Sequence, residues 1–328
     1  MTRNRLAGSI AAILLLATSV ASAPAAAQGN YPSRPVKIVL PVPPATALDV
    51  VTRVIAEEMS KTLGQRVLIE SRPGGGGLLA AQAVARAPAD GYTLLGGAAG
   101  IFTILPGQKD NLPIDLERSF THVGMIVGHG VMFLAVPPKL GIKTFPEFVA
   151  LAKAQPGKLV IGTNGVGTLP HYAGLLLQRK GGLPVTIAPY ARGGTPAVVT
   201  DIKNGLVHAT IEASFGLRGH MRSGTVQVIG AMSAARDPEF PSVPTIAETM
   251  PGLTAVGFMS LAAPAKIPES VARRLNDSLN QTLKLPAIKQ RFAELGVPIA
   301  IVSPAQANAF VNEQRKIWLP LVRELEGR

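Results

Sequence analysis

The chain has 328 residues, more than one hydrophobic core usually organises, so its length predicts two lobes. Hydrophobic residues make up 47% of the chain and charged residues only 16%, against about 25% in typical soluble proteins, which excludes a disordered protein. Cysteine is absent, which excludes disulfide scaffolds, thiolate metal sites and thiol nucleophiles.

The first 27 residues have the pattern of a secretory signal peptide. Arg3 and Arg5 form a basic start, an apolar stretch runs from Leu6 to Val20, and three alanines end at Ala27. A permanent membrane anchor is the competing interpretation, but the apolar run is shorter than the roughly 20 residues that a spanning helix needs. We therefore expect an exported, soluble protein from which residues 1–27 are removed.

Short β-rich runs alternate with amphipathic helices after the leader, a pattern typical of parallel sheets in α/β folds. The helix expected at 46–63 has apolar residues at helical spacing, Thr46 and Asp49 as a capping box, and Gly64 as its stop. The other elements expected in this block are strands at 36–40, 67–70 and 92–95, a glycine-rich turn at 71–77 and a helix at 78–86.

A second block begins with an apolar strand at 131–136. Thr144 and Glu147 fit a capping box that opens a helix ending at Ala154, and Pro320 predicts a kink or break in the last helix. The remaining expected elements are strands at 159–162, 226–230 and 258–262, and helices within 167–180, 195–204, 269–283, 287–295 and 305–326.

This order of elements predicts an α/β protein with two similar lobes and a cleft between them. Lobe 1 is expected to contain residues 28–130 and 255–328, and lobe 2 residues 131–254, because the final third returns to the first block. Ligands of open α/β sheets bind at the carboxyl ends of strands, where helix N-termini offer N–H groups to anions.

The net charge of +12 either suits an acidic partner or serves only solubility. Nucleic acid is not expected as the partner, because the basic residues are scattered singly among acids and aromatic residues make up only 5% of the chain.

The sequence contains no recognisable catalytic or metal-binding motif. The Gly74–Gly77 run lacks the following Lys-Ser/Thr of a nucleotide P-loop, and no G-x-S-x-G elbow is present. The five histidines show no spacing that suits paired metal ligands. The sequence therefore predicts no catalytic residues, no metal and no cofactor.

Several stretches, in this order and spacing, together resemble the Bug-type periplasmic receptors of tripartite tricarboxylate transporters. The resemblance implies a hinged, type II-like periplasmic-binding-protein fold, a small organic carboxylate as ligand, membrane transporter subunits as partners, and a non-catalytic monomer. A sensor subunit that docks on a membrane kinase and, less favoured, an exported α/β enzyme remain as alternatives. The stretches are Tyr31–Pro35, Ser71–Gly77, Ala89–Leu95, Lys153–Leu159, Gly165–Thr168, Val243–Glu248 and Leu261–Ala265.

In the first lobe, the resemblance places the ligand at the loops after the first and third strands. Main-chain N–H groups near the start of the first long helix are expected to serve as donors, with Pro44 supplying only shape. Thr46 is equally well explained as a helix cap, and Asp49 is better explained as a first-turn helix residue. The candidate ligand-binding residues of this lobe are Pro44, Ala45, Thr46, Ala98 and Ala99.

In the second lobe, the resemblance implies the other half of an anion clamp. Arg192 is a candidate partner for a carboxylate or a solvated turn residue, and His171 is a packing residue or a contact. Glu212 stands where the family commonly has aspartate, and it either binds a donor on the ligand or pairs with a nearby base. The candidates are Asn164, Gly167, Thr168, Arg192 and Glu212.

Apolar side chains replace glycine or hydroxyl-bearing residues of the family pattern at several positions in the first lobe. Such a wall favours aromatic or longer-chain carboxylates over small hydroxylated di- and tricarboxylates. The alternative is that these side chains pack the lobe's core and leave the pocket polar. The positions are Ala45, Ala47, Leu48, Ala98, Ala99, Ile101 and Phe102.

Overall fold

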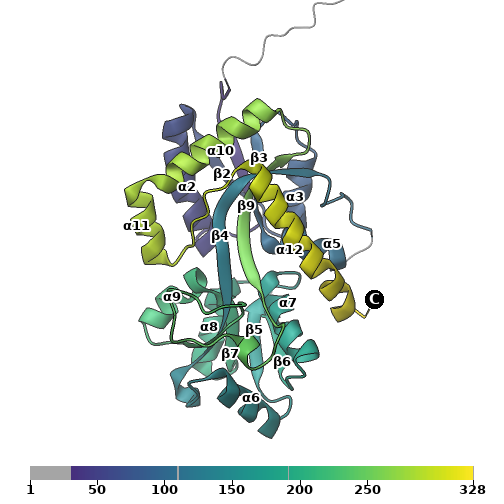
Figure 1. The fold of residues 1–328 in the computed structure, drawn as a ribbon, viewed down its shortest axis with the longest axis vertical. Helices are drawn as coiled ribbons and strands as arrows, with labels where there is room; N and C mark the ends of the chain where they lie inside the picture. Colours follow the sequence, from purple (N-terminus) through teal and green to yellow (C-terminus); the bar gives the residue numbers. More distant parts are fainter. Residues whose placement is uncertain (1–30, 109–110, 191, 328) are drawn as a thin grey trace, which may run out of the picture.

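The computed structural model describes residues 31–108, 111–190 and 192–327, and it stacks two α/β lobes along the long axis of the molecule (Figure 1). We call them the upper and lower lobes, as in Figure 1. The expected signal peptide lies outside the described residues. Within them, no helix is both long and apolar enough to span a membrane.

The upper lobe is built on a mixed sheet in the order β2-β1-β3-β9-β4. Strands β2, β1 and β3 are parallel to one another, whereas β9 is antiparallel to both β3 and β4. The strands are β1 (Val36–Leu40), β2 (Val67–Ser71), β3 (Thr93–Ala98), β4 (Phe120–Val136) and β9 (Val256–Pro264).

The lower lobe continues from the far end of β4, in the order β4-β7-β5-β6, with β8 also pairing with β4. Val131 of β4 still lies opposite Val256 of β9, but Met132 lies opposite Ala213 of β7, so one strand serves both lobes. The strands are β5 (Val160–Asn164), β6 (Thr186–Tyr190), β7 (Ala209–Ala213) and β8 (Gln227–Ala231).

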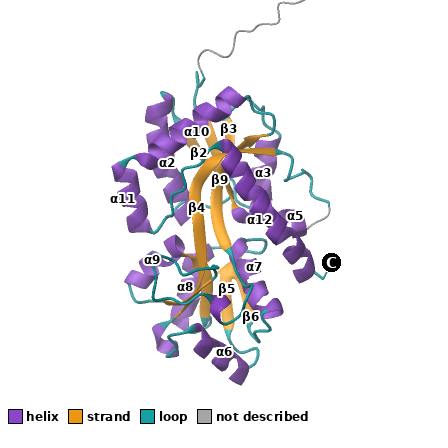
Figure 2. Ribbon diagram, in the orientation of Figure 1, coloured by secondary structure: helices purple, strands orange, loops and turns teal. Residues whose placement is uncertain are grey.

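Helices flank the strands of both lobes (Figure 2). The upper lobe has α2 (Ala47–Leu63), η1 (Gly75–Gly77), α3 (Leu78–Ala85), α4 (Ala99–Thr103), α5 (Leu105–Gln108), α10 (Glu269–Lys284), α11 (Pro286–Leu295) and α12 (Pro304–Leu325). The lower lobe has η2 (Pro138–Leu140), α6 (Phe145–Ala154), α7 (Leu169–Leu175), the π-helical η3 (Leu176–Lys180), α8 (Gly194–Asn204), α9 (Ser214–Arg222) and η4 (Ile246–Glu248).

The helix ends follow the capping signals in the sequence. The side chain of Thr46 accepts a hydrogen bond from the Asp49 amide at the start of α2, and Gly64 ends that helix in the left-handed conformation with φ of 72°. Thr144 caps α6 in the same way as Thr46 caps α2. These predicted helix boundaries are confirmed.

Two predicted elements differ from the structure. Strand β4 has 17 residues rather than the six at 131–136, because pairing with β9 holds a segment whose glycines give it little strand signal of its own. Helix α12 continues through Pro320 without the predicted break, since Val322 and Leu325 in its last turn remain buried in the core, and the alternative of a kink stays a prediction.

The largest hydrophobic cluster extends through both lobes. It joins Phe102 and Trp318 of the upper lobe to Leu169 and Tyr172 of the lower lobe. Fully burying one such side chain contributes about 1.5–3 kcal/mol, so this shared cluster couples the stability of the lobes. The predicted residue boundaries between the lobes stay a prediction.

Candidate ligand site at the lobe junction

The loops at the carboxyl ends of β3 and β5 are in contact across the junction. A Cβ added to Gly100, in the first turn of α4, would lie 3.0 Å from the carbonyl oxygen of Gly167. A Cβ added to Gly76 would lie 3.6 Å from the carbonyl oxygen of Val166. The structure therefore brings Gly167 of the lower lobe, a predicted clamp residue, against the upper-lobe loop that contains Ala98 and Ala99.

At the start of α2, the buried carboxylate of Asp49 organises the loop. Its Oδ2 accepts a hydrogen bond of 2.9 Å from the Ala45 amide, and Arg53 Nε donates to both carboxylate oxygens, at 3.0 and 2.9 Å. The Ala45 amide, expected to donate to a ligand, therefore donates to Asp49 in this structure, and its role in ligand binding stays a prediction. The structure places Asp49 in the first turn of the helix, as its helical interpretation predicted.

Thr46 is also engaged within its own loop. Its hydroxyl donates to the Pro43 carbonyl at 3.0 Å and accepts from the Asp49 amide at 3.4 Å, which is the capping role. Pro44 and Ala45 are exposed and Thr46 is partly buried. The amides of Ala47 and Leu48 come first in α2 and have no helical acceptor there, so they are the main-chain donors that this loop can offer an anion.

Ala45 adopts the left-handed conformation, with φ of 64°, which is unfavourable for a residue with a side chain. We expect Ala45→Gly to raise the free energy of unfolding by about 1 kcal/mol while keeping the bond to Asp49. Lys266, with φ of 67°, provides a second test of the same effect, and Lys266→Gly is expected to raise the free energy of unfolding by a similar amount. Urea unfolding measures both variants, and a loss of stability in both would contradict the prediction.

After β3, the predicted apolar wall divides into two parts. Ala98 is partly exposed and Ala99 buried, while Ile101 and Phe102 are 1% and 0% exposed in the core. Phe102 packs edge-on against the ring of His122, with ring centres 4.6 Å apart. The prediction that Ile101 and Phe102 form a ligand wall is therefore wrong, and their packing alternative is confirmed.

In the lower lobe, polar side chains from β5, β7 and α8 bind one another. Asn164 Nδ2 donates to Glu212 Oε2 at 2.7 Å, and the Thr195 hydroxyl donates to the same oxygen at 2.6 Å. The Ala213 amide donates to Glu212 Oε1 at 2.8 Å. Burial raises the pKa of Glu212, against the lowering effect of these three hydrogen bonds.

Sequence reasoning named Asn164 and Glu212 but missed Thr195 as their partner. The available signal was Thr195-Pro196 at the start of a predicted helix, which places a hydroxyl at the junction side of α8. Glu212 pairs with polar groups of its own lobe, and the base that the sequence interpretation offered as its partner is not among them.

The other lower-lobe candidates lie around these groups. The hydroxyl and the amide of Thr168 both donate to the Gly165 carbonyl, at 2.8 and 3.2 Å, so the loop itself uses the donors expected to clamp an anion. Arg192 is exposed beside the start of α8. His171 packs edge-on against the ring of Tyr172 at 5.3 Å, in line with its packing interpretation, and burial lowers its pKa.

Two sets of polar contacts bridge the lobes beside these loops. In the α9–α11 contact, Ser214 Oγ donates to the Gly296 carbonyl at 3.0 Å and Arg222 Nη2 donates to the Glu294 carbonyl at 3.1 Å. In the α7–α12 contact, the Tyr172 hydroxyl donates to Glu326 Oε1, and Lys180 Nζ lies 3.4 Å from Glu324 Oε2. Both use the C-terminal end of an upper-lobe helix.

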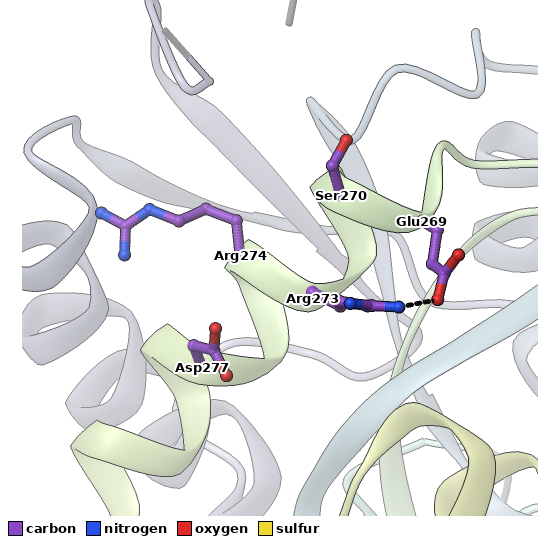
Figure 3. A pocket seen from close by; sticks show the side chains of 5 residues that line it. All are labelled: Glu269, Ser270, Arg273, Arg274 and Asp277. Carbon is purple, nitrogen blue, oxygen red and sulfur yellow. Dashed lines mark hydrogen bonds and ion pairs between the residues drawn. The ribbon is translucent and has the colours of Figure 1, made fainter. Parts of the chain in front are cut away.

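The pocket in Figure 3 lies elsewhere, along α10, and has a volume of about 450 Å³. Its lining includes the exposed ion pair between Arg273 and Glu269, and none of the predicted site residues. A second pocket of about 340 Å³ lies between η2 and the end of α8. Among the residues that the structure describes, no three metal-ligating side chains gather.

Residues 51–326 match the family model of the tripartite tricarboxylate transporter family receptor. BugT of Bordetella pertussis (strain Tohama I) is 32% identical over 313 residues, which cover 95% of this chain and 95% of BugT. The structure of R. palustris Rpa4515 with adipate has a TM-score of 0.83 and 26% identity, covering 90% of this chain and 98% of that one. MatC (Rpa3494) from Rhodopseudomonas palustris, with bound malate, has a TM-score of 0.80 and 28% identity, covering 89% and 100%.

These similarities confirm the α/β periplasmic-binding-protein fold and the absence of enzymatic activity predicted from the sequence, since members of this family are binding receptors for transport. The chain belongs to the receptor family of the tripartite tricarboxylate transporters.

Proposed function

We propose that this protein captures an organic carboxylate in the periplasm and delivers it to the membrane subunits of a tripartite tricarboxylate transporter. Export through residues 1–27 and action as a monomer are part of the proposal. Rpa4515 with adipate and MatC with malate support a carboxylate ligand. The long helix α2 and the helices α8 and α9 begin at the carboxyl ends of strands, where their first amides suit an anion.

We further propose that carboxylates without hydroxyl groups, either aromatic or with longer chains, bind more tightly than malate, tartrate or citrate. One observation carries this proposal: the side-chain hydroxyls of Thr46, Thr168 and Thr195 already donate hydrogen bonds within the protein. A ligand hydroxyl can still donate to these oxygens, but it cannot accept a hydrogen bond from them without breaking one inside the protein, and a buried polar group short of a partner costs roughly 1–3 kcal/mol.

Apolar groups of a ligand, unlike hydroxyl groups, gain free energy when they contact the first lobe. Ala98 and Leu48 retain partly exposed apolar surface, although Ile101 and Phe102 contribute none. Covering apolar ligand surface gains about 25 cal/mol per Å², so an added methylene favours binding where an added hydroxyl does not. The carboxylate itself is held by main-chain amides in either case.

The test is a thermal-shift and calorimetric panel on the purified chain without residues 1–27. We expect adipate, longer dicarboxylates or benzoate to bind about tenfold more tightly than malate, tartrate and citrate. A ligand at 100 times its Kd adds about 2.7 kcal/mol to stability, which a thermal shift detects readily. A malate or citrate Kd tenfold below that of every unhydroxylated acid would contradict the ligand preference, and no response to any carboxylate would contradict the receptor proposal.

A further inference from the structure

We infer that Glu212 and Gly216 act as a pair that fixes the first turn of α8 at the lobe junction and thereby sets ligand affinity, although Glu212 itself does not touch the ligand. This assignment rests on the proposed function in one respect, since it takes the junction to be the ligand site. Glu212 is therefore a positioning residue, which acts on the ligand through the first turn of α8.

The contacts of Glu212 come from three elements that meet at the junction. Asn164 is the last residue of β5, Thr195 is the second residue of α8, and Ala213 ends β7. Each donates one hydrogen bond to the Glu212 carboxylate. A buried carboxylate requires such partners, so the three donors and the acid hold one another in place. Glu212 thus ties the start of α8 to the ends of β5 and β7.

Gly216 provides the space that the glutamate side chain needs. A Cβ added to Gly216 in α9 would lie 2.6 Å from Cγ of Glu212 and 3.0 Å from its Cδ. Only glycine at this position lets the side chain pass over the first turn of α9. The two residues are four apart in the chain, and the glutamate side chain at position 212 can take this path only because position 216 is glycine.

The length of the side chain decides where α8 begins. An aspartate at this position would withdraw the carboxylate by about 1.5 Å, the length of one C–C bond. The bonds of 2.6 and 2.7 Å to Thr195 and Asn164 would then exceed hydrogen-bonding distance unless α8 moved toward β7. The glutamate therefore holds the first turn of α8 farther from β7 than an aspartate would.

The carboxylate also fixes the orientation of the Asn164 amide. Because both Glu212 oxygens accept hydrogen bonds, Asn164 must turn Nδ2 toward them, and its Oδ1 lies 3.1 Å from the Thr195 hydroxyl. Nδ2 carries two hydrogens, of which Glu212 takes one. Glutamine at position 212 can present its own NH₂ group to Asn164, which removes the preference for this orientation.

The binding experiment compares paired variants, with adipate as the probe in calorimetry. We expect Thr195→Val and Glu212→Gln to weaken adipate binding about tenfold, and Thr195→Ser to stay within about threefold of the parent chain. Gly216→Ala is expected to weaken binding like Glu212→Gln. The matched control is Gly219→Ala on the same helix, where an added Cβ meets nothing within 4 Å and binding should be unchanged.

Amide hydrogen exchange on the unliganded protein tests the positioning role without any ligand. We expect Glu212→Asp and Gly216→Ala to speed exchange in the first two turns of α8 about tenfold, with α6 unchanged. Failure of the parent chain to bind any carboxylate would count against the proposed function and leave this arm intact. Unchanged exchange in α8, or folded Thr195→Val and Gly216→Ala variants with the parent's adipate affinity, would overturn the inference.

Discussion

Replacing Gly100 with valine is expected to weaken carboxylate binding about a hundredfold, a loss of about 2.7 kcal/mol. A Cβ at this position would lie 3.0 Å from the Gly167 carbonyl oxygen and 3.5 Å from the Leu169 amide nitrogen. Both are backbone atoms, so no side-chain rotation relieves the contact. We therefore expect the added side chain to hold the two loops apart and to lower the population of the closed form in which, under the proposed function, a ligand is enclosed.

Calorimetry with adipate and small-angle X-ray scattering measure this effect together. The scattering of Gly100→Val should show a larger radius of gyration than that of the parent chain. Gly219→Val is the control, because Gly219 lies in a helix with open space around it. Parent-like affinity together with parent-like scattering in Gly100→Val would show that the loops need not meet for binding.

Lowering the pH from about 6.5 toward 3 is expected to reduce the free energy of unfolding through His122. This ring is 3% exposed, lies edge-on to Phe102, and bonds through Nδ1 to the Ser260 hydroxyl at 2.8 Å. Burial, with a smaller contribution from the positive charge of Arg315, lowers the pKa of His122 to about 3. The unfolded chain therefore takes up a proton at a higher pH than the folded protein does.

Because of this difference in pKa, the free energy of unfolding falls as the pH is lowered. The stability due to neutral His122 is fully present above about pH 6.5 and is lost as the pH falls toward the folded-state pKa, by up to about 1.4 kcal/mol per pH unit. The lowered pKa values of His129, His171 and His220 add to the same trend, and the raised pKa of Glu212 opposes it.

Urea unfolding across this pH range, on the parent chain and on two variants, checks the assignment. We expect His122→Gln to be less stable at pH 7.5 but to lose less stability on acidification. His129→Gln, at an exposed position, should keep most of the slope. An unchanged slope in His122→Gln would assign the acid sensitivity to other groups.

Local signals in the sequence were sufficient for much of the fold. Thr46 and Gly64 mark the ends of α2 because capping depends on a few neighbouring residues. Strand β4 could not be predicted in full, since it contains Gly124, Gly128 and Gly130 and is held by pairing with β9, more than a hundred residues away in the chain. Long-range pairing leaves no signal within a short window of sequence.

The candidate site was likewise predictable only in part, because some of its features depend on contacts between residues far apart in the chain. A family resemblance places residues at the junction, but it does not say which way consecutive side chains point, so Ile101 and Phe102 were assigned to a wall although they pack the core. It also does not reveal that neighbouring groups use one another's donors. The bonds of Glu212 to Asn164 and Thr195 join residues 48 and 17 positions apart, and only the folded chain brings them together.

The contacts that bridge the lobes bear on how long an enclosed molecule would stay. Arg222 and Ser214 bind the carbonyls at the end of α11, and Lys180 and Tyr172 bind the acids at the end of α12. None of these groups belongs to a ligand, so separating the lobes requires the same contacts to break whatever lies between them. If the proposed ligand leaves by separation of the lobes, its escape includes a barrier that the protein itself supplies, and different ligands share that part of their residence time.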